Sequence, residues 1–362
     1  MLIRSPDDPS LAALCAKLRE AAENLETPGA WPQEQLDACA QAGVFRWFVE
    51  SRLGGWGWPE ADLLRAYVAL ASSCLTTTFV ITQRMGAVQR IASGASDLAR
   101  VELLEDLLAG RAFATVGISH LTTSRQHLGR PVLRAEEAGD HLILDGYSPW
   151  VTGADHAQAL VLGATLADGR QVLTVVPTDL PGVQVDPPLP LVGLAASHTG
   201  PVRLTRVRVP RAWLLAGPAE QVLQQGVGAR TGGLQTSALA LGLASAAIAY
   251  LQEQSIPRSE LLEPAEALDA ERDALMQAML VLASSGAAGA AGTHQITPHE
   301  LRRRANSLAL RATQAALAAA KGAGYVRGHP AGRWCCEALF FLVWSCPQPV
   351  VQANLCELAH LV

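Results

Sequence analysis

The chain has 362 residues, of which 49% are hydrophobic and only 17% are charged, and its formal net charge is −5 at pH 7. Chains longer than about 250–300 residues usually divide into several packed domains, so we expect two or three. The weakly acidic charge balance offers no basic surface for DNA, RNA or an anionic membrane, and it predicts neither partner.

The seven cysteines are odd in number and show no Cys-x-x-Cys spacing. Most stand in apolar, helix-like stretches, which favours reduced, buried thiols over a disulfide framework or a zinc site, so we expect no metal. The first residues lack the apolar core of a signal peptide, and the longest apolar run, Ala238–Leu251, is too short to span a bilayer. The sequence therefore predicts a soluble cytoplasmic protein.

A helical pattern extends over Ser10–Ala109. Apolar residues recur there at three- and four-residue steps, as on the core face of a helix, beginning with Leu11, Leu14, Leu18 and Ala22. The glycines of Gly54–Gly57 interrupt the pattern as a tight turn, and Gly110 ends the last helix. We predict an N-terminal helical domain over residues 1–112.

Strand patterns begin after this helical part. Apolar and polar residues alternate with a period of two in Val172–Val176 and Val202–Val209, and glycines and prolines separate the runs. A half-buried strand shows this period because successive side chains point to opposite faces of the sheet. We predict a sandwich- or barrel-like β domain over residues 113–216.

The last part of the chain, residues 217–362, is again helical. Three long segments each keep an apolar stripe in which small residues dominate, so that neighbouring helices can approach closely. These segments are 232–254, 268–284 and 301–321. We predict a C-terminal four-helix bundle, and hence a mainly α protein with a small central β domain.

Local motifs at several separated places share the order and spacing of one known family. The longest, D-G-Y-S-P-W-V-T-G-A-D-H-A at Asp145–Ala157, is similar to a flavin-contacting strand that typically has the pattern N-G-x-K-x-W-I-T-N-G-x-x-A. The others are Pro32–Gly43 with the Gly54–Gly57 turn, Val207–Pro210, Ala238–Ala244 and Gly322–Tyr325. Over nearly its whole length the chain thus resembles the acyl-CoA dehydrogenase family, which includes oxidases and flavin monooxygenases. The resemblance implies an FAD cofactor and an acyl thioester or similar hydrophobic substrate.

The resemblance also implies the residues that contact FAD. Trp150 matches the tryptophan that covers one face of the flavin ring, and Thr152 matches the threonine that hydrogen-bonds near N5 and O4. Gly117 and Ser119 match a backbone segment that pairs with the pyrimidine edge, and Ser124 matches a serine beside the pyrophosphate. A tryptophan that only packs in the core is the alternative to the first assignment.

A homodimer or homotetramer is implied as well, because family members complete each FAD site from a neighbouring subunit. Gly322 and Gly324 match glycines that let the partner's backbone approach the cofactor. The usual R-x-x-F-G motif is missing around Glu271–Leu282, and Ala319 stands where a glutamine is usual. Glycines that merely end a helix remain the alternative.

The family's usual catalytic base is absent from the sequence. When Arg333 and Glu337 are read as remnants of an E-R-x-x-R-D stretch, Ser345 occupies the place of the catalytic glutamate. A serine hydroxyl cannot act as a base at pH 7 without an activating partner. Residues 228–233, where some relatives carry the glutamate instead, contain no carboxylate.

Three interpretations follow from this absence. In the first, the protein is a dehydrogenase that acts on the CH–CH group of an acyl thioester and passes electrons to a partner protein, with Glu337, Glu357 or His120 as the base. In the second it is a flavin-dependent monooxygenase or oxidase, in which His120 and Ser119 hydrogen-bond near flavin C4a and N5. In the third it is a homologue that binds or assembles without catalysis.

Overall fold

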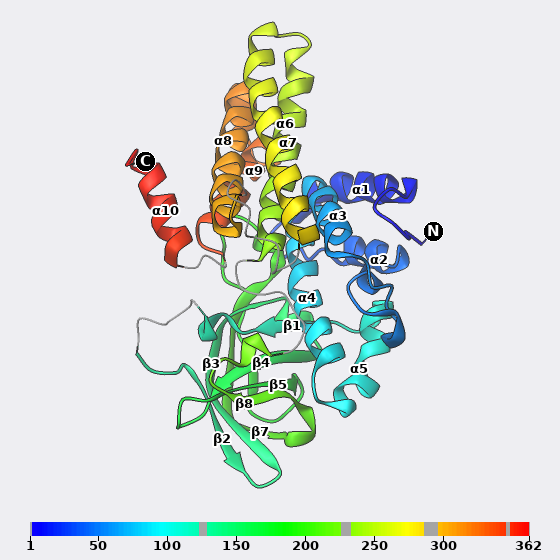
Figure 1. Cartoon of the computed structure of the whole chain (residues 1–362), viewed down its shortest axis with the longest axis vertical. Helices are drawn as coiled ribbons and strands as arrows, with labels where there is room; N and C mark the ends of the chain where they lie inside the picture. The colour runs from blue at the N-terminus through cyan, green and yellow to red at the C-terminus, as the bar shows by residue number, and fades with distance from the viewer. Residues whose placement is uncertain (1, 123–128, 226–232, 286–295, 345–347, 362) are drawn as a thin grey trace.

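A computed structural model describes residues 2–122, 129–225, 233–285, 296–344 and 348–361. Helices form the first and last parts of the chain and strands the part between them. In Figure 1 the strands lie at the bottom, below the C-terminal helices and beside the N-terminal ones. The N-terminal helices are α1 (Pro9–Ala21), α2 (Gln33–Gln41), α3 (Glu60–Ser73), α4 (Leu75–Ser93) and α5 (Asp97–Ala109).

Capping side chains fix where several helices begin. Asp8 accepts a hydrogen bond from the backbone N–H of Ser10 at the start of α1, and Ser96 accepts one from Ala99 at the start of α5. Each cap satisfies an N–H group that has no partner within the helix. Gly110 ends α5 in the left-handed conformation, as its sequence position predicts.

The strands form one mixed sheet. They are β1 (Ala114–Gly117), β2 (Leu133–Ala138), β3 (His141–Thr152), β4 (Ala159–Thr165), β5 (Gln171–Pro177), β6 (Val183–Val185), β7 (Thr199–Pro210) and β8 (Leu214–Ala219). Their order is β6-β7-β3-β2-β4-β5-β8, and β1 pairs in parallel with β4. The longest pairing joins β3 and β7 in antiparallel register.

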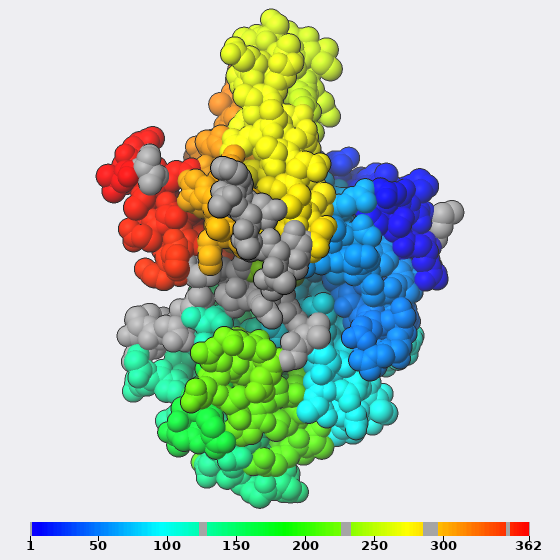
Figure 2. Space-filling view, viewed as in Figure 1, coloured from blue at the N-terminus to red at the C-terminus, as the bar shows by residue number. Residues whose placement is uncertain are grey.

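The C-terminal helices are α6 (Leu234–Ser255), α7 (Leu262–Ser285), α8 (Pro298–Gly324), α9 (Pro330–Ala338) and α10 (Gln348–Leu358). They stand above the sheet and beside the N-terminal helices (Figure 2). Helix α6 packs against α7 and α8 in the bundle and also against α3, so it is buried on most sides. At Gly242 a Cβ atom would lie only 2.6 Å from the Cβ of Ala71, so the glycine permits this close approach.

Helix α6 is also long and apolar enough, by length and composition, to cross a membrane. Of its most apolar stretch, 67% is buried inside the protein. A core helix packed between two helical layers has the same composition.

One excursion from the sheet reaches both helical parts. The segment between β6 and β7 carries a short 3₁₀ helix, η7 (Ala195–Ser197), which packs against α4. At Gly193 a Cβ atom would lie 2.6 Å from the carbonyl oxygen of Cys336 on α9, so only a glycine allows the segment to pass there.

The predicted fold class is confirmed: helices flank a central β domain, and the C-terminal helices form a bundle. The exact domain limits, 1–112, 113–216 and 217–362, remain predictions. The packing of α6 on α3 was not foreseen, because a stripe of small residues does not indicate which helix will cover it.

Candidate functional site

An irregularity near the end of β3 exposes Trp150. Two residues of β3, Pro149 and Trp150, lie between the pairs Ser148–Val202 and Val151–Gly200, whereas β7 has only Pro201 in that interval. Such an extra residue is a β-bulge, which redirects a side chain out of the regular alternation. Trp150 is therefore 41% exposed, although Ser148 and Val151 on either side are fully buried.

Thr152 lies two residues further on and joins a chain of three hydroxyl groups. Its Oγ1 is 2.9 Å from Oγ1 of Thr199, which is in turn 2.9 Å from Oγ of Ser197. All three side chains are buried. The chain fixes the orientation of Thr152, and it could not be seen in the sequence because it joins the end of β3 to the η7 turn.

Gly117 ends β1 beside the same part of β3. A Cβ atom there would lie 2.6 Å from Oγ of Ser148 and 2.6 Å from Leu162. Within the part of the chain that the structure describes, the buried hydroxyl oxygens of Ser148 and Ser119 have no hydrogen-bond partner. Buried hydroxyls normally have one, so these two point to a polar group that binds beside Gly117.

This arrangement fits the flavin that the sequence motif implies. Trp150 supplies an exposed aromatic face, the Gly117 backbone leaves no room for a side chain, and Ser119 and Ser148 offer hydroxyls for the polar edge of a ring. Ser148 was missed by sequence reasoning, since a serine in a strand carries no distinctive signal.

His120 is buried next to this group. Its Nε2 is 2.7 Å from the carbonyl oxygen of Gly163 on β4, so Nε2 carries the proton and donates it. Burial lowers the pKa of the His120 imidazole below its usual value, because the charged form is poorly solvated there. His120 is thus held neutral near pH 7.

The two candidate glutamates lie in different surroundings. Glu337 on α9 is buried and accepts a hydrogen bond from the hydroxyl of Thr76 at 3.2 Å. Burial raises the pKa of Glu337 to about 7, against the opposing effect of Arg333. Glu357 on α10 forms an ion pair of 2.7 Å with Arg303 on α8. The carboxylate of Glu357 is therefore already paired with a cation.

The two glycines of α8 differ from each other. A Cβ atom at Gly322 would meet nothing within 4 Å, whereas one at Gly324 would lie 2.7 Å from the Cβ of Ala320. Packing within this chain therefore explains the glycine at position 324. The backbone at Gly322 is open to a contact from another molecule. Ser124, Ser345 and residues 228–232 lie outside the described residues.

Two hollows among the described residues are lined by other residues than Trp150. One of about 420 Å³ is lined by residues that include Trp31, Arg84, Asp155 and His156, between the first helices and the sheet. The residues that line it do not include Trp150.

No known family profile matches the chain, but individual relatives do. A probable acyl-CoA dehydrogenase, YngJ of Bacillus subtilis, is 25% identical over 244 residues, which cover 64% of each chain. The matched part is therefore less than two thirds of that relative's length.

Solved structures match over almost the whole chain. Butyryl-CoA dehydrogenase of Megasphaera elsdenii has a TM-score of 0.81 at 17% identity, and 97% of each chain is covered. A glutaryl-CoA dehydrogenase of Mycobacterium smegmatis in complex with FADH2 has a TM-score of 0.79 at 18% identity, with 99% of each chain covered. Dibenzothiophene monooxygenase of Paenibacillus has a TM-score of 0.75 at 18% identity, with 97% of each chain covered.

The protein has the acyl-CoA dehydrogenase fold, with helical domains on both sides of a β domain. The fold and the relative named above support a likeness to acyl-CoA dehydrogenases.

Proposed function

We propose that the protein is an FAD-dependent oxidoreductase that acts on the CH–CH group of an acyl thioester or a similar hydrophobic substrate. The single observation that carries this proposal is the bulge in β3, which presents Trp150 to solvent. Its neighbour in β3, Ser148, faces Gly117, and the buried hydroxyls of Ser148 and Ser119 lack partners among the described residues. Tryptophans are highly buried on average, so an exposed one in a strand leaves an aromatic face available for a ligand.

The residues divide the work of holding the cofactor. Trp150 would lie against one face of the ring and exclude water, while Thr152, oriented by Thr199, would hydrogen-bond at its edge. Ser119 and Ser148 would donate to polar atoms of the ring. FAD, when bound, supplies the acceptor for the hydride that leaves the substrate β-carbon as the α-proton is removed.

A second candidate function is that of a flavin-dependent monooxygenase or oxidase. It is favoured by Ser345, which stands where the family has the glutamate that acts as the catalytic base. The neutral imidazole of His120 and the hydroxyl of Ser119 suit hydrogen bonding near the reactive side of the ring better than they suit removal of an α-proton.

We further propose a homodimer or homotetramer, an electron-transfer protein as a partner, and a cytoplasmic location. The open backbone at Gly322 supports a contact from another subunit. The cysteines at 15, 39, 74, 335, 336 and 356 are free thiols, as expected in a reducing compartment.

Cofactor binding is tested first. The purified protein should hold one FAD per chain, measured by the absorbance and chromatographic identity of flavin released on heating. Trp150→Ala and Thr152→Val should each weaken FAD binding by at least about tenfold, whereas Trp150→Phe should retain most of it because the aromatic face remains. A folded wild-type protein that binds no added FAD would reject both enzyme functions and leave the non-catalytic homologue.

The two chemistries are then separated with the flavin-loaded protein. Loss of the oxidised flavin absorbance when a series of acyl-CoA thioesters is added without oxygen supports the dehydrogenase. If no thioester reduces the flavin, but chemically reduced protein consumes oxygen and oxygenates a substrate, the second candidate replaces the first.

A further inference from the structure

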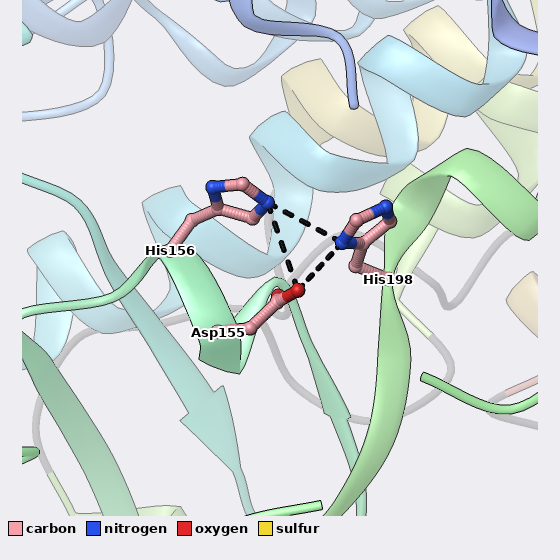
Figure 3. A group of neighbouring side chains, drawn as sticks. All are labelled: Asp155, His156 and His198. Carbon is pink, nitrogen blue, oxygen red and sulfur yellow. Dashed lines mark hydrogen bonds and ion pairs between the residues drawn. The ribbon is translucent and has the colours of Figure 1, made fainter. Parts of the chain in front are cut away.

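A compact group of metal-ligating side chains lies on the two turns that adjoin Thr152 and Thr199. Asp155, His156 and His198 each offer one ligand atom, and these atoms all lie within 4.8 Å of one another. Figure 3 shows the three side chains pointing to a common place, with Asp155 and His156 on one turn and His198 on another.

Backbone geometry holds the two turns together. Gly153, at φ +63°, leads into the 3₁₀ turn η6 (Ala154–His156), and His198, at φ +49°, ends η7. The N–H of Gly153 donates to the carbonyl oxygen of His198 at 3.0 Å. The ligands are therefore positioned by backbone structure and not only by side-chain rotation.

The proton position on His198 favours a bound cation. Its Nε2 is 3.0 Å from the carbonyl oxygen of Ala30, which can only accept, so Nε2 carries a proton. A metal-binding histidine characteristically donates its second ring N–H to such a carbonyl, which directs the other nitrogen to the metal. Here the other nitrogen, Nδ1, faces Asp155 and His156.

The distances suit a small divalent ion. Nε2 of His156 is 3.3 Å from Nδ1 of His198 and 3.7 Å from Oδ2 of Asp155. Two ligands on a tetrahedral zinc with bonds of about 2.0–2.1 Å lie roughly 3.3 Å apart. Nδ1 of His198 and Oδ2 of Asp155 are 2.6 Å apart, so Asp155 must move outward by less than about 1 Å, which its 31% exposed side chain permits.

We propose that Asp155, His156 and His198 form a binding site for a divalent transition-metal ion of the zinc type. Two imidazoles and one carboxylate match the preference of such ions, while calcium and magnesium prefer oxygen ligands alone. Binding displaces any proton on Nδ1 of His198 to solvent, and water completes the coordination. The cysteine spacing that argued against zinc in the sequence has no bearing on this site, because its two histidines are 42 residues apart.

The ion would join the sheet to the first helical part of the chain. Trp31 stacks on the ring of His156 at 4.1 Å with an angle of 10°, and Ala30 receives the hydrogen bond from His198. Both lie in the segment that precedes α2. The role assigned to the ion is to fasten this segment against the sheet.

The test uses the full-length protein after removal of metals with a chelator and dialysis. Titration with Zn²⁺ by calorimetry, and with Co²⁺ by visible absorption, should show one site per chain with micromolar or tighter affinity. Saturation should also raise Tm, since the ion binds the folded state selectively. Mg²⁺ should not compete.

Variants locate the site. His156→Gln and Asp155→Asn should each lower the affinity for Co²⁺ by at least about tenfold. His141→Gln is the matched control, because His141 and Asp140 form a single surface pair with 2.5 Å between their facing atoms and no third ligand in the described structure. This control should bind Co²⁺ as the wild type does.

If a variant of Asp155 or His156 fails to fold, tryptophan fluorescence of the folded wild type provides an independent test. Bound Cu²⁺ or Co²⁺ should quench the fluorescence of Trp31, and Trp31→Phe should remove the quenched component. The proposal would be overturned if the wild type bound neither Zn²⁺ nor Co²⁺ stoichiometrically. It would also be overturned if His156→Gln bound Co²⁺ as tightly as the wild type. The group would then be a hydrogen-bonded cluster only.

Discussion

Thr76 on α4 donates a hydrogen bond of 3.2 Å to the carboxyl group of Glu337 on α9, a residue 261 positions later in the chain. This contact joins the N-terminal helices to the bundle through a fully buried acid. Burial raises the pKa of Glu337 from 4.5 to about 7.

Replacing Glu337 should change the pH dependence of stability. Between pH 4.5 and 7 the unfolded chain has lost the proton and the folded chain keeps it, so the stability of the wild type falls as pH rises through this window. Glu337→Gln removes this loss, and its stability relative to wild type should improve by roughly 2.5 kcal/mol from pH 5 to pH 8. Denaturant unfolding at several pH values measures the difference.

Thr76→Val supplies the second arm of that experiment. The threonine hydroxyl lowers the pKa of Glu337, so its loss should raise that pKa further and extend the fall in stability to higher pH. Parallel pH profiles for wild type and Glu337→Gln would contradict the assignment of the titration to Glu337.

His120→Gln should remove a different part of the pH profile. Burial lowers the pKa of His120 below 6.5, so the stability that it contributes is present above that pH and is lost as the pH falls through 6.5 toward the folded-state pKa. The glutamine amide can still donate to Gly163 but does not titrate. The stability of His120→Gln should therefore fall less than that of the wild type as the pH is lowered below 6.5. His120→Ala should cost about 1–3 kcal/mol at pH 7, because the Gly163 carbonyl loses its donor. Identical acid unfolding of wild type and His120→Gln would refute this.

Two alanine substitutions in α8 should separate packing from assembly. Gly324→Ala places a Cβ 2.7 Å from Ala320 and should destabilise the chain by about 1–3 kcal/mol. Gly322→Ala meets nothing within 4 Å and should change stability by less than about 0.5 kcal/mol. If another subunit contacts Gly322, this second variant should shift the sedimentation profile toward the monomer, and an unchanged profile would argue against such a contact.

Gly242→Ala tests the contact between α6 and α3. Alanine gains up to about 1 kcal/mol over glycine in a helix interior. The added Cβ would nevertheless lie 2.6 Å from Ala71 and 2.7 Å from the carbonyl oxygen of Val68, and overpacking costs about 1–3 kcal/mol. We expect net destabilisation, measured as a lower Tm. A higher Tm would mean that the two helices separate easily at this point.

Local patterns of the sequence were sufficient to predict the order of helices, strands and helices. Periodicity, caps such as Ser96 and stops such as Gly110 depend on neighbouring residues only. The motif around Trp150 also predicted a strand, and β3 covers Trp150 and Thr152. The exposure of Trp150 could not be predicted, because a bulge is defined by the register of β3 against β7, some 50 residues away.

The remaining site features depend on contacts that are distant in sequence. Nothing near Glu337 reveals that Thr76 will face it, and nothing near Asp155 reveals His198. Cysteine spacing can be read along the chain, whereas a histidine pair brought together by two separate turns cannot. Thr199 was missed for the same reason, since its hydroxyl is oriented by Thr152 on the adjacent strand.

The segment between β6 and β7 passes close to the backbone of Cys336, which only Gly193 allows. This contact affects how the protein unfolds. A domain joined to its neighbours only by linkers can open alone and expose its connections to proteases. Here the loop between β6 and β7 contacts both α4 and α9. Native-state proteolysis should therefore release no intact sheet fragment, and hydrogen exchange in β7 and α9 should proceed with the same free energy of opening.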